Sequence, residues 1–176
     1  LHITRRLQDK ADHLAAEANM VHERRKMITQ LSNLALQLYS WYVKNGHARN
    51  EKDEAGVRQF FREHLPPNAY QQTGFYERLY LYQSYGWYAF IRQDFLQYYR
   101  YAQKWVDLFR ENPEMISVET GHYIKGMHNL MNAHFDLRNH QQLDIVLEEF
   151  ERFAPSHIVQ HHDNFRVQTF VYIQQA

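Results

Sequence analysis

The sequence repeats a four-residue aromatic motif at an interval of 46 residues. Segment 39–42 reads Tyr-Ser-Trp-Tyr, and segment 85–88 reads Tyr-Gly-Trp-Tyr. Another 46 residues lead to segment 131–134, where the motif is weaker. Intervals of this size are typical of helical hairpins that stack, because one hairpin cannot bury its apolar face alone. The repeat therefore predicts a fold built from similar stacked units.

Apolar residues are spaced for helices along nearly the whole chain. In segment 143–153 they lie at relative positions 0, 3, 4, 7 and 10, which is one face of a helix. No stretch alternates convincingly with a period of two, so no strand is expected. Asn45-Gly46 predicts a helix end, because glycine tolerates the left-handed conformation after a last turn. Asn50 predicts the start of the next helix. The predicted class is all-α, an α-solenoid of stacked antiparallel helical hairpins.

We expect one helical repeat domain with long units of about 46 residues. The hairpin turns are predicted near Gly46, Gln93-Asp94 and Asn139-His140, and prolines follow the second helices. The chain opens on Leu1 and stops inside an apolar-periodic stretch, so we interpret it as a piece of a longer protein. The predicted segments are 1–27 as a preceding or capping helix, 28–67, 74–113 and 114–155 as units one to three, and 156–176 as the start of a truncated fourth unit.

The units resemble tetratricopeptide (TPR) repeats over residues 28–155. The TPR pattern places large, small and tyrosine residues on the first helix, followed by a polar turn and a closing proline. The matching residues are Tyr82, Tyr85, Gly86, Gln93, Asp94, Phe95, Tyr98, Ala102, Trp105 and Pro113 in unit two, Leu38, Ser40, Tyr42 and Gly46 in unit one, and Leu130, Asn132 and Pro155 in unit three. TPR units repeat about every 34 residues, so longer helices are expected here. The sequence is similar to uncharacterised bacterial TPR-like proteins, which implies a cytoplasmic bacterial protein and assigns no reaction.

Composition excludes several classes of protein. The chain has no cysteine, which rules out a disulfide framework, a thiol nucleophile and a cysteine-rich zinc site. Lys+Arg and Asp+Glu both number 20. A balanced charge argues against direct binding to nucleic acid or to an anionic membrane, since both need an excess of positive charge. No apolar run approaches the roughly 20 residues that span a bilayer.

Three side-chain amides recur at the 46-residue interval and form the best candidate binding site. They are Gln37, Gln83 and Asn129. In TPR-like stacks the equivalent positions face a concave groove, where an amide can bond the backbone of an extended peptide. Trp41 and Trp87 lie four residues further on, where an aromatic residue can anchor a partner. The alternative is that both tryptophans belong to the core and that the amides bond neighbouring backbone.

Chemistry-bearing motifs are weak. His157 and His161 have the i, i+4 spacing that can bind zinc or nickel on a helix, but a polar helix start explains them as well. No local catalytic signature, phosphate loop or dinucleotide fingerprint occurs, so we expect neither an enzyme nor a cofactor.

The leading hypothesis is a non-catalytic interaction module that presents a concave groove to a protein or peptide partner. The alternatives are a sensor or oligomerisation domain of a bacterial regulator, and a metal-binding protein that uses the late histidines. Exposed apolar residues of the truncated last helix, such as Phe170 and Val171, predict possible self-association.

Overall fold

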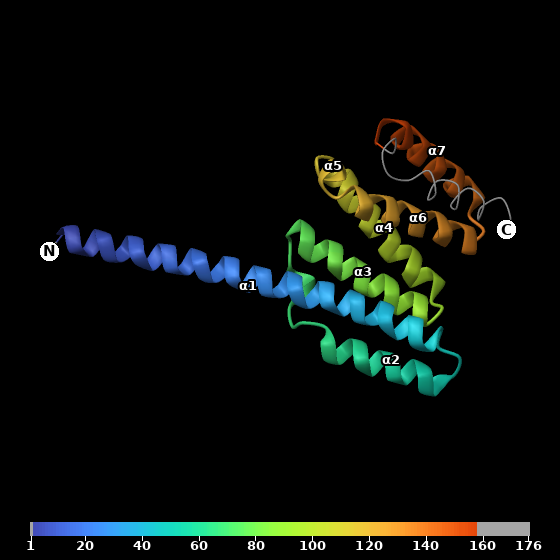
Figure 1. Cartoon of the computed structure of the whole chain (residues 1–176), viewed down its shortest axis with the longest axis horizontal. Coiled ribbons are helices and arrows are strands. Elements are labelled where there is room, and N and C mark those ends of the chain that lie inside the picture. The colour runs from blue at the N-terminus through green and yellow to red at the C-terminus, as the bar shows by residue number, and fades with distance from the viewer. Residues whose placement is uncertain (1, 158–176) are drawn as a thin grey trace. The chain divides into compact units, whose positions relative to one another are not determined.

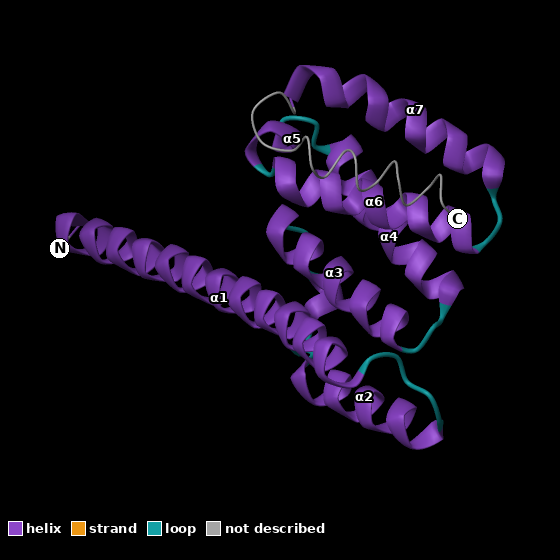
Figure 2. Ribbon diagram, turned by 45° about the vertical axis from the view of Figure 1, so that its right-hand side comes forward, coloured by secondary structure: helices purple, strands orange, loops and turns teal. Residues whose placement is uncertain are grey.

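The computed structural model describes residues 2–157, and every regular element within that range is helical (Figures 1 and 2). The predicted all-α class is therefore confirmed for this part of the chain. The helices are α1 (His2–Asn45), α2 (Glu51–His64), the 3-10 turn η1 (Ala69–Gln71), α3 (Phe75–Ile91), α4 (Phe95–Glu111), α5 (Met115–Val118), α6 (Thr120–Asp136) and α7 (His140–His157). The chain divides into two compact units, an N-terminal unit, Leu1–Arg92, and a C-terminal unit, Gln93–Ala176. No described helix is both long and apolar enough to cross a membrane.

The predicted turns lie where the sequence placed them. Gly46 adopts a φ of 73° directly after α1, and its N–H donates to the Tyr42 carbonyl. The Asn50 side chain accepts from the N–H of Asp53 and so begins α2. Asp94 caps α4 in the same way, by accepting from the N–H of Gln97. The expected helix ends and starts are therefore confirmed at these positions.

The left-handed conformation recurs after the first helix of each expected hairpin. Gly46 follows α1, Gln93 follows α3 and Arg138 follows α6, with φ values of 73°, 56° and 56°. α6 begins 45 residues after α3 (120 against 75), and α7 begins 45 residues after α4 (140 against 95). The sequence interval therefore corresponds to a repeated order of helix, tight turn and helix.

Several predicted boundaries are wrong. Residues 1–27 are not a separate helix, because α1 runs unbroken for 44 residues and contains neither glycine nor proline. Within the predicted third unit, the short α5 ends at Val118 and the first long helix, α6, begins at Thr120. α7 includes Pro155, because a proline in the last turn removes one hydrogen bond and leaves the preceding turns intact.

The predicted unit two, 74–113, is divided between the two compact units. α3 packs mainly on α1, and α4 packs mainly on α6. The two helices of this predicted hairpin therefore contribute to separate cores, which the sequence analysis did not anticipate. The physical reason is that an amphipathic helix must bury its apolar stripe against another helix, and α3 and α4 do so on different partners.

The N-terminal unit is held together by apolar side chains of the second half of α1. Leu34 and Leu38 pack with Val57 and Phe61 of α2 and with Ile91 of α3. A second cluster joins the η1 turn to α1 and α3. It consists of Leu31 of α1, Ala69 of η1 and Leu81 of α3. Each fully buried leucine contributes about 1.5–3 kcal/mol.

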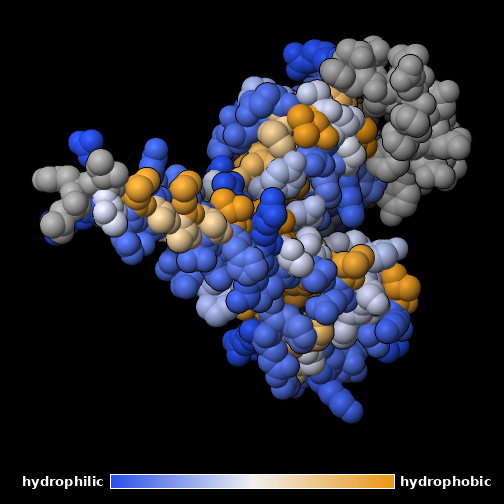
Figure 3. All heavy atoms as spheres, turned by 60° about the vertical axis from the view of Figure 1, so that its left-hand side comes forward, coloured by the Kyte–Doolittle hydropathy of each residue, from blue (hydrophilic) through white to orange (hydrophobic). Residues whose placement is uncertain are grey.

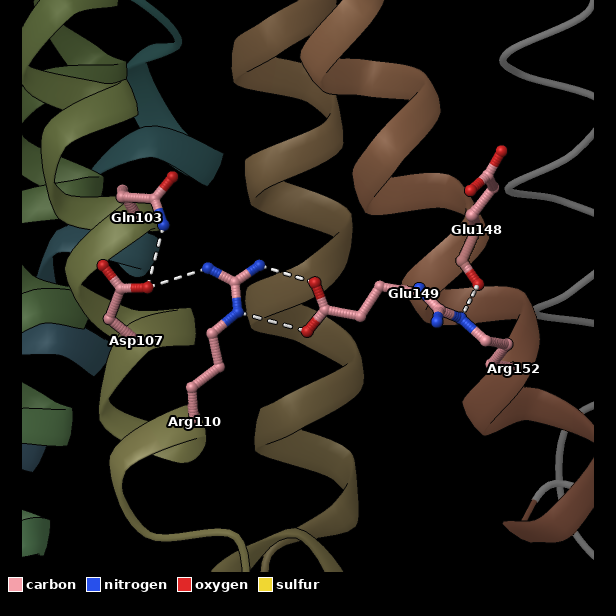
Figure 4. Close-up of polar contacts among 6 residues, drawn as sticks. All are labelled: Gln103, Asp107, Arg110, Glu148, Glu149 and Arg152. Atoms are coloured by element: carbon pink, nitrogen blue, oxygen red, sulfur yellow. Dashed lines mark hydrogen bonds and ion pairs between the residues drawn. The ribbon is translucent and has the colours of Figure 1, made fainter.

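The C-terminal unit buries aromatic and methionine side chains between α4, α6 and α7. Phe109 of α4 is fully buried, and its ring lies 5.4 Å from that of Tyr123 on α6. Arg110 ties α4 to α7, because its Nε and Nη2 donate to the two carboxylate oxygens of Glu149 at 3.1 and 2.6 Å (Figure 4). Its Nη1 also donates to Asp107. The bidentate pair of Arg110 with Glu149 fixes the geometry of the two side chains better than a single hydrogen bond would.

Helix α6 lies close to Trp105 of α4 at Gly126. A Cβ at Gly126 would lie 2.9 Å from Cδ1 and Nε1 of Trp105, a rigid ring that is itself buried. Gly126→Ala is therefore expected to displace Trp105 and to destabilise the C-terminal unit by about 1–3 kcal/mol. Denaturant unfolding and hydrogen exchange of α4 and α6 measure the loss. Gly121→Ala, on the same helix, is the matched control: its Cβ would meet open space, so no loss is expected. Equal stability of the two variants would contradict this close approach.

Candidate functional site

The predicted amide ladder does not share one environment. Gln37 is exposed on α1, whereas Gln83 of α3 is only 7% exposed. Asn129 of α6 is half-buried and belongs to the other compact unit. A buried amide offers little surface to a peptide, so the burial of Gln83 argues against a peptide contact there and favours the alternative that the amides bond neighbouring groups. The 46-residue interval preserved the residue type at these positions and not the exposure.

Trp41 and Trp87 pack against the core of the N-terminal unit. Both are half-buried and pack against the hydrophobic cluster that contains Leu34 and Leu38. The Trp87 ring is 5.8 Å from that of Tyr42. This arrangement favours the alternative that the sequence analysis kept open, in which the two tryptophans are core residues.

The predicted metal ligands are not tested by the structure. His157 is the last described residue of α7, and His161 lies outside the described residues, as do Phe170 and Val171. Among the residues that are described, no three His, Asp or Glu side chains gather as a metal site would require. The metal hypothesis therefore stays a prediction about the end of the chain.

A groove of about 780 Å³ runs between α1 and the segment 66–74 of the N-terminal unit. Its walls carry the apolar side chains of Met20 and Met27. At its base the Nε of Arg24 donates to Oε1 of Glu77 at 2.6 Å, which links α1 to α3. Glu77 is 1% exposed, and its Oε2 is buried without a hydrogen-bond partner in the described structure. The groove therefore has a buried carboxylate at its base that a single arginine neutralises.

Gly74 makes room for this pair. A Cβ at Gly74 would lie 1.9 Å from Oε2 of Glu77 and 2.6 Å from Nη2 of Arg24. Any larger residue would push the carboxylate out of its buried position and away from the arginine. Gly74 is also the residue before the first turn of α3, so the backbone of the connection and the ion pair are placed together.

The first half of α1 is exposed over its whole circumference. Every residue from 4 to 26 is exposed in the described structure, and this segment extends past the other helices of the N-terminal unit (Figure 1). Apolar side chains nevertheless gather along it (Figure 3). We define the α1 row as Leu7, Ala11, Leu14, Ala18 and Val21. Its large members are between 52% and 63% exposed, which is a high exposure for side chains of this size.

The α1 row lies on a different face of the helix from the core. At 100° per residue, the row centres about 150° around the helix axis from the buried residues Leu31, Leu34 and Leu38. It is therefore not the continuation of the face that packs on α3. Arg25 ends the row. None of the predicted site residues belongs to this row, although its spacings of 4, 3, 4 and 3 residues are visible in the sequence.

Histidines of α6 lie in environments of decreasing exposure. His122 and His128 are half-buried, and His134 is 1% exposed. The His134 ring lies 5.1 Å from the Tyr99 ring, and its Nδ1 has no hydrogen-bond partner in the described structure. Burial lowers the pKa of all three histidines, and for His134 the nearby Arg110 guanidinium lowers the pKa further. The surroundings of these side chains in the C-terminal unit therefore disfavour their protonated form.

Other ionisable groups of the C-terminal unit are shifted by burial as well. Burial raises the pKa of Tyr123 to about 12 and raises the pKa of the Asp136 carboxyl. Burial also lowers the pKa of the Lys125 ammonium. These groups are spread over α6 and do not converge on one cleft, so we assign them no joint chemistry.

Comparison with family models, with curated proteins and with solved structures finds no match to this chain. The resemblance to TPR repeats therefore rests on the sequence positions quoted above.

The Arg24–Glu77 pair yields a test of the groove. Arg24→Ala is expected to destabilise the N-terminal unit by about 1–3 kcal/mol, because it leaves a buried carboxylate without its counter-charge. Arg24→Ala with Glu77→Leu should recover most of that loss. Urea unfolding monitored by circular dichroism measures both. Arg25→Ala removes a neighbouring exposed arginine and serves as the control. If Arg24→Ala lowers the unfolding free energy no more than Arg25→Ala does, the ion pair contributes nothing to stability.

The buried histidines predict a dependence of stability on pH. A histidine whose folded pKa is below its ordinary value of 6.5 binds fewer protons when folded than when unfolded. Its contribution to stability is therefore complete above pH 6.5 and falls as the pH drops below that value. His134→Leu should weaken the decrease in unfolding free energy between about pH 7.5 and pH 5.5. His140→Gln changes an exposed histidine and should leave the decrease as in the parent chain. An unchanged decrease in His134→Leu would refute the assignment.

Proposed function

We propose that this chain is a non-catalytic interaction or scaffold module that binds a protein partner through the α1 row. The observation that carries the proposal is the exposure of the row on a helix segment that nothing else in the described residues covers. Exposed apolar patches that are larger than scattered single residues mark interaction surfaces. The polar and charged residues beside the row give it the rim that protein interfaces have.

We further propose that the chain belongs to the TPR-like helical-repeat class, as an α-solenoid of antiparallel hairpins. The 45-residue spacing of α3 to α6 and of α4 to α7 supports this, together with the recurring left-handed residue after each first helix. The proposal moves the contact surface from the amide ladder to α1, because Gln83 is buried and both tryptophans pack on the core.

Photo-crosslinking tests the function at the row itself. A photoreactive amino acid replaces Leu14 in the chain, which is then produced in its native cells and irradiated. We expect a defined adduct with a protein partner, and we expect the same substitution at Ile145, which is 53% exposed, to give none.

A triple variant tests whether the apolar side chains cause the adduct. Leu7→Gln, Leu14→Gln and Val21→Gln together should abolish partner binding, which is then followed from a crosslinker at position 8, beside the row. Leu96→Gln, Val118→Gln and Ile145→Gln form the matched control, because these residues are 69%, 64% and 53% exposed against 63%, 61% and 52% in the row. Binding that survives the row variant, or that is lost equally in both, would refute the proposal.

A further inference from the structure

We propose that the α1 row is the self-association surface of this protein, and that it pairs with the α1 row of a second copy as a short antiparallel coiled coil. The inference rests on the proposed function and names the partner of that same surface. Row residues that face each other across the pair have numbers that sum to 25, so that Leu7 of one copy meets Ala18 of the other. On the flanking edge that holds Lys10, the facing residues have numbers that sum to 27.

The spacing of the row is that of a coiled coil. Leu7, Leu14 and Val21 recur every seven residues, and Ala11 and Ala18 lie between them at the alternate position of the heptad. Most of the remaining positions are polar, as a two-stranded coiled coil requires of residues that face water. Thr4 and Arg25 occupy the positions before and after the row and limit its length.

The sizes of the side chains select the antiparallel direction. The row alternates large and small residues. In the antiparallel register each central layer combines one large and one small side chain, as Leu7 with Ala18 and Ala11 with Leu14, and the symmetry repeats both layers. A parallel pair would place alanine on alanine in every second layer, which leaves voids there. Because interiors need even packing, facing large and small residues are the better fit.

The charges beside the row select the same direction. Lys10 and Glu17 flank the row on one edge, and the antiparallel register brings Lys10 of each copy to Glu17 of the other. In a parallel pair Lys10 would instead face Ala15, and no opposite charge would meet it. Glu17 lies 3.5 Å from His13 on its own helix and is still 54% exposed, so it remains open to the partner lysine.

The geometry of α1 leaves room for a second helix. The row faces away from α3, so a partner helix on it does not meet the core of the N-terminal unit. Residues 4–21 span about 27 Å of helix, and the antiparallel direction places the two N-terminal units beyond opposite ends of that span. The exposed first half of α1 is continuous with its packed second half. The paired segment is therefore already helical and loses little conformational freedom on association.

Charge reversal tests the register. The full chain is studied by sedimentation and light scattering from about 5 µM to about 500 µM at low salt, since an interface this small binds weakly and has a high dissociation constant. We expect a monomer–dimer equilibrium. Lys10→Glu or Glu17→Lys alone should raise the dissociation constant about tenfold, because each creates two like-charge pairs across the dimer. The double variant restores both pairs and should return to within about twofold of the parent chain.

Introduced cysteines test the direction, and the chain offers a clean background because it contains none of its own. A Leu7→Cys chain and an Ala18→Cys chain of different mass are mixed and oxidised gently. The antiparallel register predicts a disulfide between the two chains. In a parallel pair positions 7 and 18 would be about 16 Å apart along the axis, beyond the roughly 7 Å that a disulfide bridges, and Leu7→Cys chains would link to each other.

The outcomes separate this inference from the proposed function. A chain that stays monomeric over the whole concentration range overturns self-association, while a photo-adduct at Leu14 with another protein would leave the proposed function standing. Dimers that link through identical positions, or that ignore the charge reversals, overturn the antiparallel register. Loss of every adduct and every dimer would overturn both.

Discussion

The N-terminal unit depends on the burial of α1 leucines against α3 and α2. Leu31, Leu34 and Leu38 are almost completely buried, and they hold the second half of a helix that has no break in 44 residues. Because the backbone of α1 is continuous, fixing this half also fixes the direction of the first half. The apolar burial at one end of α1 is therefore what presents the exposed row at the other end.

The same helix also positions the groove. Arg24 lies where α1 leaves the packed region, and it is the residue that neutralises the buried Glu77 of α3. Gly74 is the point at which the connecting segment approaches closely enough to enclose that carboxylate. The charge at the base of the groove thus depends on the α1–α3 packing, since a small rotation of either helix would separate Arg24 from Glu77.

The C-terminal unit uses a different balance of forces. It buries large aromatic and methionine side chains with a neutral histidine among them, and it adds the Arg110–Glu149 pair at its edge. A buried neutral histidine favours folding only while the solution leaves it unprotonated. The two units therefore differ in chemistry: the N-terminal unit presents an apolar surface, whereas the stability of the C-terminal unit responds to acid.

The sequence by itself determined that the described chain is helical and where its main turns lie. Gly46, Asn50 and Asp94 act within a few residues of their own backbone, so local chemistry is sufficient to predict what they do. Only the tertiary structure decided which faces are buried. Gln37 and Gln83 occupy equivalent places in the repeat, yet one is exposed and the other buried, because burial depends on which helix lies opposite. The α1 row could be found from its spacing, but its exposure could not, since no local signal tells whether another helix covers a given face.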